Sequence, residues 1–146
     1  MKKVLLMILI VLGTMQWAKA SDVVTQDLKK LPTTAQNFLS QHFPQTRISY
    51  VKIEKEFLSG KEYEVVLTSG TEVTFNGKGE WKEVDSKRAS VPANIIPLTI
   101  RDYVKTNFAD NIITQIEKEK RGYEVELDND LTLKFTNEGR LISIDD

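Results

Sequence analysis

Residues 63–86 read YEVVLTSGTEVTFNGKGEWKEVDS, and residues 123–146 read YEVELDNDLTLKFTNEGRLISIDD. In both stretches apolar side chains alternate with polar ones, which is the period of a half-buried β-strand. Asn76-Gly77 and Asn137-Glu138-Gly139 separate the alternating runs, and Asn and Gly at such positions favour hairpin turns. Each stretch therefore predicts short antiparallel strands joined by tight turns.

The chain is internally repetitive. A shift of 60 residues aligns the two quoted stretches, and a shift of 65 aligns residues 31–54 with residues 96–119. We interpret the chain as two copies of one unit of roughly 55 residues, in residues 21–86 and 96–146, joined by a connector in residues 87–95. The matched positions include Leu31-Pro32 with Ile96-Pro97, Tyr63-Glu64-Val65 with Tyr123-Glu124-Val125, and Gly79 with Gly139.

Each unit is predicted to open with a helix. Pro32 and Pro97 suit a first helical turn, where a missing N–H costs nothing. Apolar residues then recur at helical spacing, and Pro44 ends the first helix. The prediction for each unit is one helix followed by four short antiparallel strands. Because a unit of this size buries only a modest core, we expect an α+β fold in which the two sheets join edge to edge. This gives one eight-stranded sheet with helices on one face.

The first twenty residues have the pattern of a secretory signal peptide. Lys2 and Lys3 form a positive start, Val4–Leu12 is an unbroken apolar run, and Ala18-Lys19-Ala20 supplies small residues for a signal peptidase. The apolar run is too short for a permanent membrane span, which needs about 20 residues. We predict cleavage after Ala20, export to the periplasm and no stable membrane anchor afterwards.

The composition excludes several classes of function. The full chain has 20 basic and 21 acidic residues, and removal of Lys2, Lys3 and Lys19 leaves 17 bases against 21 acids. This balance does not fit a dedicated nucleic-acid binder. The absence of cysteine removes disulfides, thiolate nucleophiles and Cys-based zinc sites. His42 is the single histidine, so no metal site and no cofactor are expected.

Two groups of residues resemble a known family. The first is Leu-Pro…Phe-Leu…Phe-Pro followed by YEVVL and EVTFNGKGEWKEVD, and the second half carries the same pattern. Over residues 31–146 the chain resembles the PepSY-like, β-lactamase-inhibitor-like periplasmic proteins of Bacteroides-type bacteria. The resemblance implies tandem helix-plus-four-strand modules, as in β-lactamase inhibitory protein, where the sheet face binds an enzyme. The modules of that inhibitor are cross-linked by disulfides, whereas this chain has no cysteine.

Trp81 is the most informative candidate for a binding residue. If Val84 and its repeat partner Ile144 face the core, strand alternation places Trp81 and Leu141 on the opposite, open face. An exposed Trp among polar side chains is typical of a recognition hot spot. Alternatively, a bulge after Gly79 would turn Trp81 inward. Both alternatives remain open on the sequence alone.

Other polar residues favour structural roles. His42 has no second His or Cys to complete a metal site, so we interpret it as a surface helix residue. Asp128-Asn129-Asp130 lacks the spaced carboxylates of a calcium loop and is typical of a turn. The pairs Glu62/Glu64 and Glu124/Glu126 each share a strand face, as a catalytic carboxylate pair would, yet solvated strand faces are usually charged. No catalytic residues are therefore predicted.

Three functions are compatible with these features to different degrees. The first is a non-catalytic exported binding module, such as an inhibitor or modulator, that contacts an unidentified periplasmic or surface protein through the open sheet face. The second is a periplasmic sensor of a small ligand or of envelope stress. The third is an enzyme, for which no nucleophile, base or metal constellation is found. The binding module is the preferred interpretation, with the contact residues Trp81, Leu141, Glu64, Thr74, Glu124 and Lys134.

Overall fold

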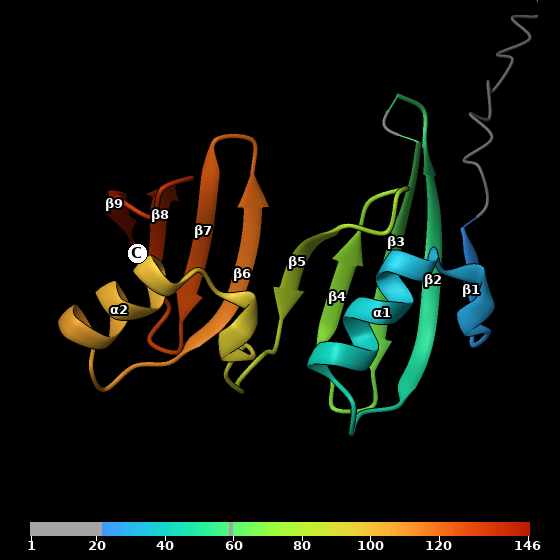
Figure 1. Cartoon of the computed structure of the whole chain (residues 1–146), viewed down its shortest axis with the longest axis horizontal. Coiled ribbons are helices and arrows are strands. Elements are labelled where there is room, and N and C mark those ends of the chain that lie inside the picture. The colour runs from blue at the N-terminus through green and yellow to red at the C-terminus, as the bar shows by residue number, and fades with distance from the viewer. Residues whose placement is uncertain (1–21, 59) are drawn as a thin grey trace, which may run out of the picture.

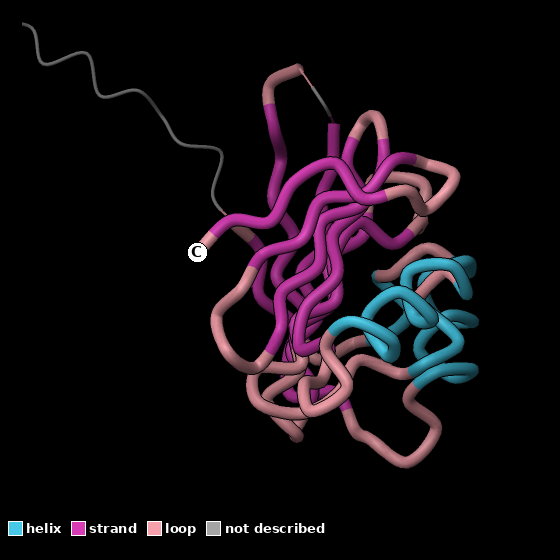
Figure 2. The backbone as a smooth tube through the Cα atoms, turned by 90° about the vertical axis from the view of Figure 1, so that its left-hand side faces the viewer, coloured by secondary structure: helices cyan, strands magenta, loops and turns pink. Residues whose placement is uncertain are grey.

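A single antiparallel sheet forms the body of the protein, and two helices lie on one side of it (Figures 1 and 2). The computed structural model describes residues 22–58 and 60–146. The predicted signal peptide lies outside these residues. Within the described part of the chain, no helix is both long and apolar enough to cross a membrane.

The chain runs through the same order of elements twice. In each half a short 3-10 turn is followed by a ten-residue helix and then by four strands. The first half, preceded by the short strand β1 (Val23–Thr25), contains η1 (Leu28–Lys30), α1 (Thr33–His42), β2 (Ile48–Glu56), β3 (Gly60–Leu67), β4 (Glu72–Phe75) and β5 (Trp81–Asp85). The second half contains η2 (Ala93–Ile95), α2 (Leu98–Asn107), β6 (Ile113–Glu119), β7 (Gly122–Leu127), β8 (Thr132–Thr136) and β9 (Leu141–Asp145).

The strands follow one another across the sheet in the order of the sequence, from β1 to β9. The predicted edge-to-edge connection is confirmed, because β5 pairs with β6 through Glu83–Glu117, Val84–Ile116 and Asp85–Gln115. The predicted number of eight strands is wrong, because the sheet has nine. The additional strand is β1, which pairs with β2 at the edge and whose three residues are too short for alternation to reveal.

Each helix begins directly after a proline. Pro32 and Pro97 are the N-terminal caps, with φ of −55° and −52° and extended ψ values. Since proline disfavours a helical conformation of the residue before it and needs no N–H partner, it suits such a boundary. α1 buries Ala35 and Leu39 against the sheet, and α2 packs its own apolar side chains in the same way. Both helices lie on the same side of the sheet (Figure 2).

The core is a row of side chains that crosses the sheet beneath the helices. Seven residues in successive register positions are each 0% exposed. The row consists of Val51, Val65, Val73, Val84, Ile116, Val125 and Leu133. Neighbouring residues along each strand point to the other face, so the register of this row determines which side chains the open face carries.

Candidate functional site

The face of the sheet away from the helices carries two rows of aligned side chains, which we call the acidic face. The two rows hold eight carboxylates and only two lysines. The central row is Lys52, Glu64, Thr74, Glu83, Glu117, Glu124, Lys134 and Ser143. The second row is Tyr50, Val66, Glu72, Asp85, Gln115, Glu126, Thr132 and Asp145.

Four of the predicted contact residues lie together in the central row. Glu64 is opposite Thr74, and Glu124 is opposite Lys134. The Lys134 ammonium lies 3.7 Å from Glu124 and 3.6 Å from Asp145. At the other end of the row, Lys52 pairs with Glu54. Lysines thus lie beside Glu124 towards one end of the row and beside Glu54 at the other, and the Lys82 charge acts on Glu117 between them.

The centre of the row brings Glu83, Glu117 and Glu124 side by side on β5, β6 and β7. Partial burial and the neighbouring Glu117 charge raise the pKa of Glu83, although Gln115 donates a hydrogen bond to it. Burial and the Glu119 and Glu124 charges likewise raise the pKa of Glu117. Glu83 and Glu117 are not recognisable as a pair from the sequence, because their contact depends on the β5–β6 register.

Trp81 lies on the helix side of the sheet, so its predicted position on the open face is wrong. A bulge at Thr74/Phe75 shifts the register and places Trp81 opposite the buried Phe75. The Trp81 ring is partly buried and stacks on Phe38 of α1, with 6.1 Å between ring centroids and 30° between planes. The Lys118 ammonium lies 4.0 Å above the Trp81 ring. The bulge alternative thus describes this strand.

Leu141 repeats this arrangement. A bulge at Lys134/Phe135 places Leu141 opposite Phe135, and Leu141 packs partly buried against the core. Its predicted position on the open face is therefore wrong for the same reason. Ile144, expected to face the core, lies opposite the buried Leu133 but is 44% exposed on the last strand of the described sheet, and Ile142 at the bulge is 62% exposed.

The residues considered as metal or calcium ligands have local structural contacts instead. His42 is partly buried, its ring lies 4.5 Å from the Phe38 ring, and burial lowers its pKa. The Asp128 carboxylate accepts hydrogen bonds from the Asn111 amide and the Ile112 N–H, which lower its pKa. Asp130 has a φ of 67°, a left-handed turn conformation that Asp tolerates better than most residues.

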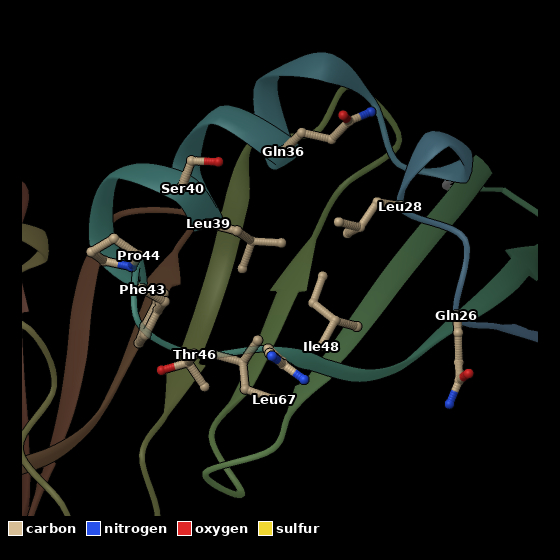
Figure 3. A pocket seen from close by; sticks show the side chains of 11 residues that line it. Gln26, Leu28, Gln36, Leu39, Ser40, Phe43, Pro44, Thr46, Ile48 and Leu67 are labelled. Carbon is tan, nitrogen blue, oxygen red and sulfur yellow. The ribbon is translucent and has the colours of Figure 1, made fainter.

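A second candidate site is a cavity of about 610 Å³ between α1, η1 and the start of β2. Leu28, Leu39 and Ile48 point toward one another from these three elements (Figure 3). Leu67 on β3 and Phe43 at the end of α1 also line it. Its size and its apolar lining are those of small-molecule binding pockets.

Polar groups surround this cavity, and among the described residues Arg47 is the only charged one that lines it. Gln26 and Gln36 donate hydrogen bonds to the Ser49 and Leu31 carbonyls. Across the residues that the structure describes, no carboxylate forms an ion pair with Arg47. No sequence pattern indicated this site, since its lining comes from segments that only the fold brings together.

Comparisons with known proteins agree with this fold. The model of the family described as "Putative beta-lactamase-inhibitor-like, PepSY-like" matches residues 61–143. No curated protein matches the chain. A crystal structure from Bacteroides vulgatus, "a putative periplasmic protein of unknown function", is 41% identical with a TM-score of 0.83, over 86% of this chain and 100% of that one.

Two further crystal structures are similar. A Bacteroides thetaiotaomicron protein described as "putative calcium-regulated periplasmic" is 43% identical with a TM-score of 0.81, over 86% of this chain and 97% of that one. A second B. vulgatus "putative periplasmic protein" is 36% identical with a TM-score of 0.80, over 87% and 98% of the two chains. These descriptions support a periplasmic location.

Proposed function

Since the chain belongs to the PepSY-like family, we propose that it is a non-catalytic periplasmic binding module whose acidic face contacts a partner protein with a basic surface. The observation that carries this proposal is the alignment of Glu83, Glu117 and Glu124 in one row, on the face opposite the two described helices. Carboxylates directly opposite one another destabilise a sheet. A basic partner would relieve this repulsion and gain favourable charge contacts.

The binding surface in this proposal differs from the one expected at first. Glu64, Thr74, Glu124 and Lys134 remain its contact residues, and Glu83 and Glu117 join them. Trp81 and Leu141 are left out, because both pack on the helix side. The family's description as inhibitor-like supports a protein partner, and inhibition or modulation of that partner is part of the proposal.

Single engineered cysteines provide a direct test, because the chain has no other thiol. A heterobifunctional cross-linker attached to Thr74→Cys samples the acidic face, and one attached to Asn37→Cys samples the exposed outer side of α1. In periplasmic extract, we expect Thr74→Cys to form one discrete adduct that Asn37→Cys does not form. The adduct should weaken with salt and in the background Glu83→Gln/Glu117→Gln. Adducts from Asn37→Cys alone, or equal adducts from both, would contradict the proposal.

Export and the origin of the two halves belong to the same proposal. We propose that residues 1–20 are a signal peptide cleaved after Ala20, and that residues 21–86 and 96–146 are tandem copies of one unit. The shared order of elements in the two halves supports the second point. The periplasmic descriptions of the similar structures support the first.

Calcium regulation, the property in the description of the B. thetaiotaomicron protein, is not part of this proposal. Within residues 22–58 and 60–146, no group of three or more His, Cys, Asp or Glu side chains could hold a metal ion. The Asp128 carboxylate, in the loop that most resembles a calcium site, is engaged by Asn111 and Ile112. The cavity beside α1 favours a second candidate function, recognition of a small ligand, and is considered next.

A further inference from the structure

The cavity beside α1 has a smaller counterpart beside α2. Features that the two cavities share follow from the fold, and features found only beside α1 are specific to that site. The counterpart has a volume of about 250 Å³ and is lined from η2, α2 and the start of β6. Its lining lies 65 residues further along the chain, so that Leu39 corresponds to Val104 and Ile48 to Ile113. A helix packed on this sheet therefore does not by itself leave 610 Å³ open.

The difference arises from the segment that precedes each helix. Beside α2, Val91 is 3% exposed and its N–H donates to the Ile113 carbonyl, which draws the segment against the sheet. Ile95 on the same segment is also buried. Beside α1, the corresponding residues are Gln26 and Lys30, neither of which is buried.

Strand β1 explains why the first segment does not fill the cavity. Val23–Thr25 pairs with β2 at the sheet edge, and the side chain of Gln26, which lines the cavity (Figure 3), donates a hydrogen bond to the Ser49 carbonyl of β2. Leu28 remains 43% exposed at the border of the cavity. An exposed leucine beside an unfilled apolar space would gain from any apolar group that covers it.

The residues that line the cavity indicate which class of ligand it would bind. Four aliphatic side chains line the cavity, Leu28, Leu39, Ile48 and Leu67, which suits an aliphatic body. Arg47 supplies one cation without a carboxylate partner among the described side chains, and its counterpart beside α2 is Ile112. A guanidinium binds a planar carboxylate through two parallel hydrogen bonds.

We propose that the cavity beside α1 binds a small anionic amphiphile, a medium-chain aliphatic carboxylate whose chain packs on Leu28, Leu39 and Ile48 and whose head group pairs with Arg47. This site is separate from the acidic face and does not depend on the proposed partner protein. Fatty acids have this chemistry, including those released by hydrolysis of envelope lipids. Mass spectrometry of ligands extracted from the protein purified from its periplasm would identify the bound acid and its chain length.

Decanoate, decanol and decyltrimethylammonium are matched probes, because they share a ten-carbon chain and differ in head-group charge. Titration of the ¹⁵N-labelled protein without residues 1–20, at probe concentrations below micelle formation, should show saturable one-to-one binding of decanoate. Amide shifts should centre on Ser40 and Thr46, which line the cavity, and should spare Thr74 on the acidic face. Decanol should bind about tenfold or more weakly, and decyltrimethylammonium weaker still.

Three variants complete the test. Arg47→Gln should weaken decanoate binding about tenfold or more and leave decanol binding unchanged. Ser40→Phe should fill the cavity and weaken both. Arg140→Gln is the matched control, since Arg140 is highly exposed and distant in sequence, and it should bind decanoate like the unaltered protein.

Folding of each variant is checked by its urea unfolding curve, and Arg47 is exposed, so Arg47→Gln keeps the test valid if Ser40→Phe fails to fold. Absence of saturable decanoate binding would overturn the proposal. So would equal binding of decanoate and decanol, equal loss in Arg47→Gln and Arg140→Gln, or shifts centred on the acidic face.

Discussion

The turn residue Gly79 lies against Pro32 at the start of α1, so closely that a Cβ on Gly79 would stand 2.7 Å from the Pro32 Cβ. The same atom would stand 3.0 Å from the Ala35 nitrogen. The φ of Gly79 is +83°, a conformation that residues with a side chain rarely adopt. The β4–β5 turn thus holds the first turn of α1 on the sheet.

Gly79→Ala should therefore destabilise the protein more than Gly70→Ala. Gly70 has a similar φ of +90° but open space around it, so its substitution should cost only the backbone strain of about 1–2 kcal/mol. Gly79→Ala should cost about 1–3 kcal/mol more, because Pro32 and Ala35 must move. Urea unfolding of both variants measures the difference, and equal losses would show that the contact with α1 contributes nothing.

Trp81→Ala should destabilise the protein by about 2–3 kcal/mol, below the roughly 3–5 kcal/mol of a fully buried aromatic, because Trp81 is only partly buried. Trp81→Phe, which keeps a ring beside Phe38, should lose less stability than Trp81→Ala. In protein without residues 1–20, Trp81 is the only tryptophan, so its emission should be blue-shifted and poorly quenched by iodide. A loss within about 0.5 kcal/mol together with red-shifted emission would place Trp81 in solvent instead.

Glu83→Gln should stabilise the protein at pH 7 by a few tenths to about 1 kcal/mol, the usual cost of like charges opposite one another in a sheet. The folded state raises the pKa of Glu83 above its ordinary value of 4.5. At pH values between this ordinary value and the raised pKa, the folded protein therefore binds more protons than the unfolded chain. The free energy of unfolding falls as the pH rises through this window. The gain from Glu83→Gln should vanish near pH 4.

Chemical unfolding of both proteins at pH 4 and pH 7 provides the measurement. Glu138→Gln is the control, because the Thr136 hydroxyl holds the pKa of the exposed Glu138 below its ordinary value. That shift has the opposite sign, so Glu138→Gln should give no gain at pH 7. A pH-independent gain from Glu83→Gln would show that charge repulsion is not its cause.

Residues 21–86 expressed alone should not fold as a stable monomer. This fragment ends in β5 without the β6 partner of Val84 and its neighbours, and an unpaired strand edge favours association. Size-exclusion chromatography and thermal unfolding would report this. A monomeric fragment that melts as cooperatively as the full chain would instead identify the two halves as independent domains.

Exported protein recovered from its native host should begin at Ser21. This expectation rests on the pattern of residues 1–20, where small residues precede the predicted cleavage point at Ala20. N-terminal sequencing of the periplasmic fraction measures it directly. Recovery of exported protein with Met1 intact would contradict it.

Local patterns in the sequence were sufficient for the elements and their order. Strand alternation around Tyr63-Glu64-Val65 and Tyr123-Glu124-Val125, together with prolines before both helices, predicted an α+β fold with helices on one face, and the sheet is joined at β5–β6 as expected. These features could be predicted because alternation, helical spacing and turn residues act over a few neighbouring positions. The placement of Glu64 and Glu124 on the open face followed from the same period of two.

Only the tertiary structure decided the features that depend on one residue of register or on distant segments. A single-residue bulge beside Phe75 reverses the alternation and turns Trp81 toward α1. Strand β1 is too short to be recognised from its sequence, and it exists because β2 offers an edge to pair with. The contact of Glu83 with Glu117 and the cavity that Arg47 shares with Leu28 join residues far apart in the chain, and local patterns carry no information about such contacts.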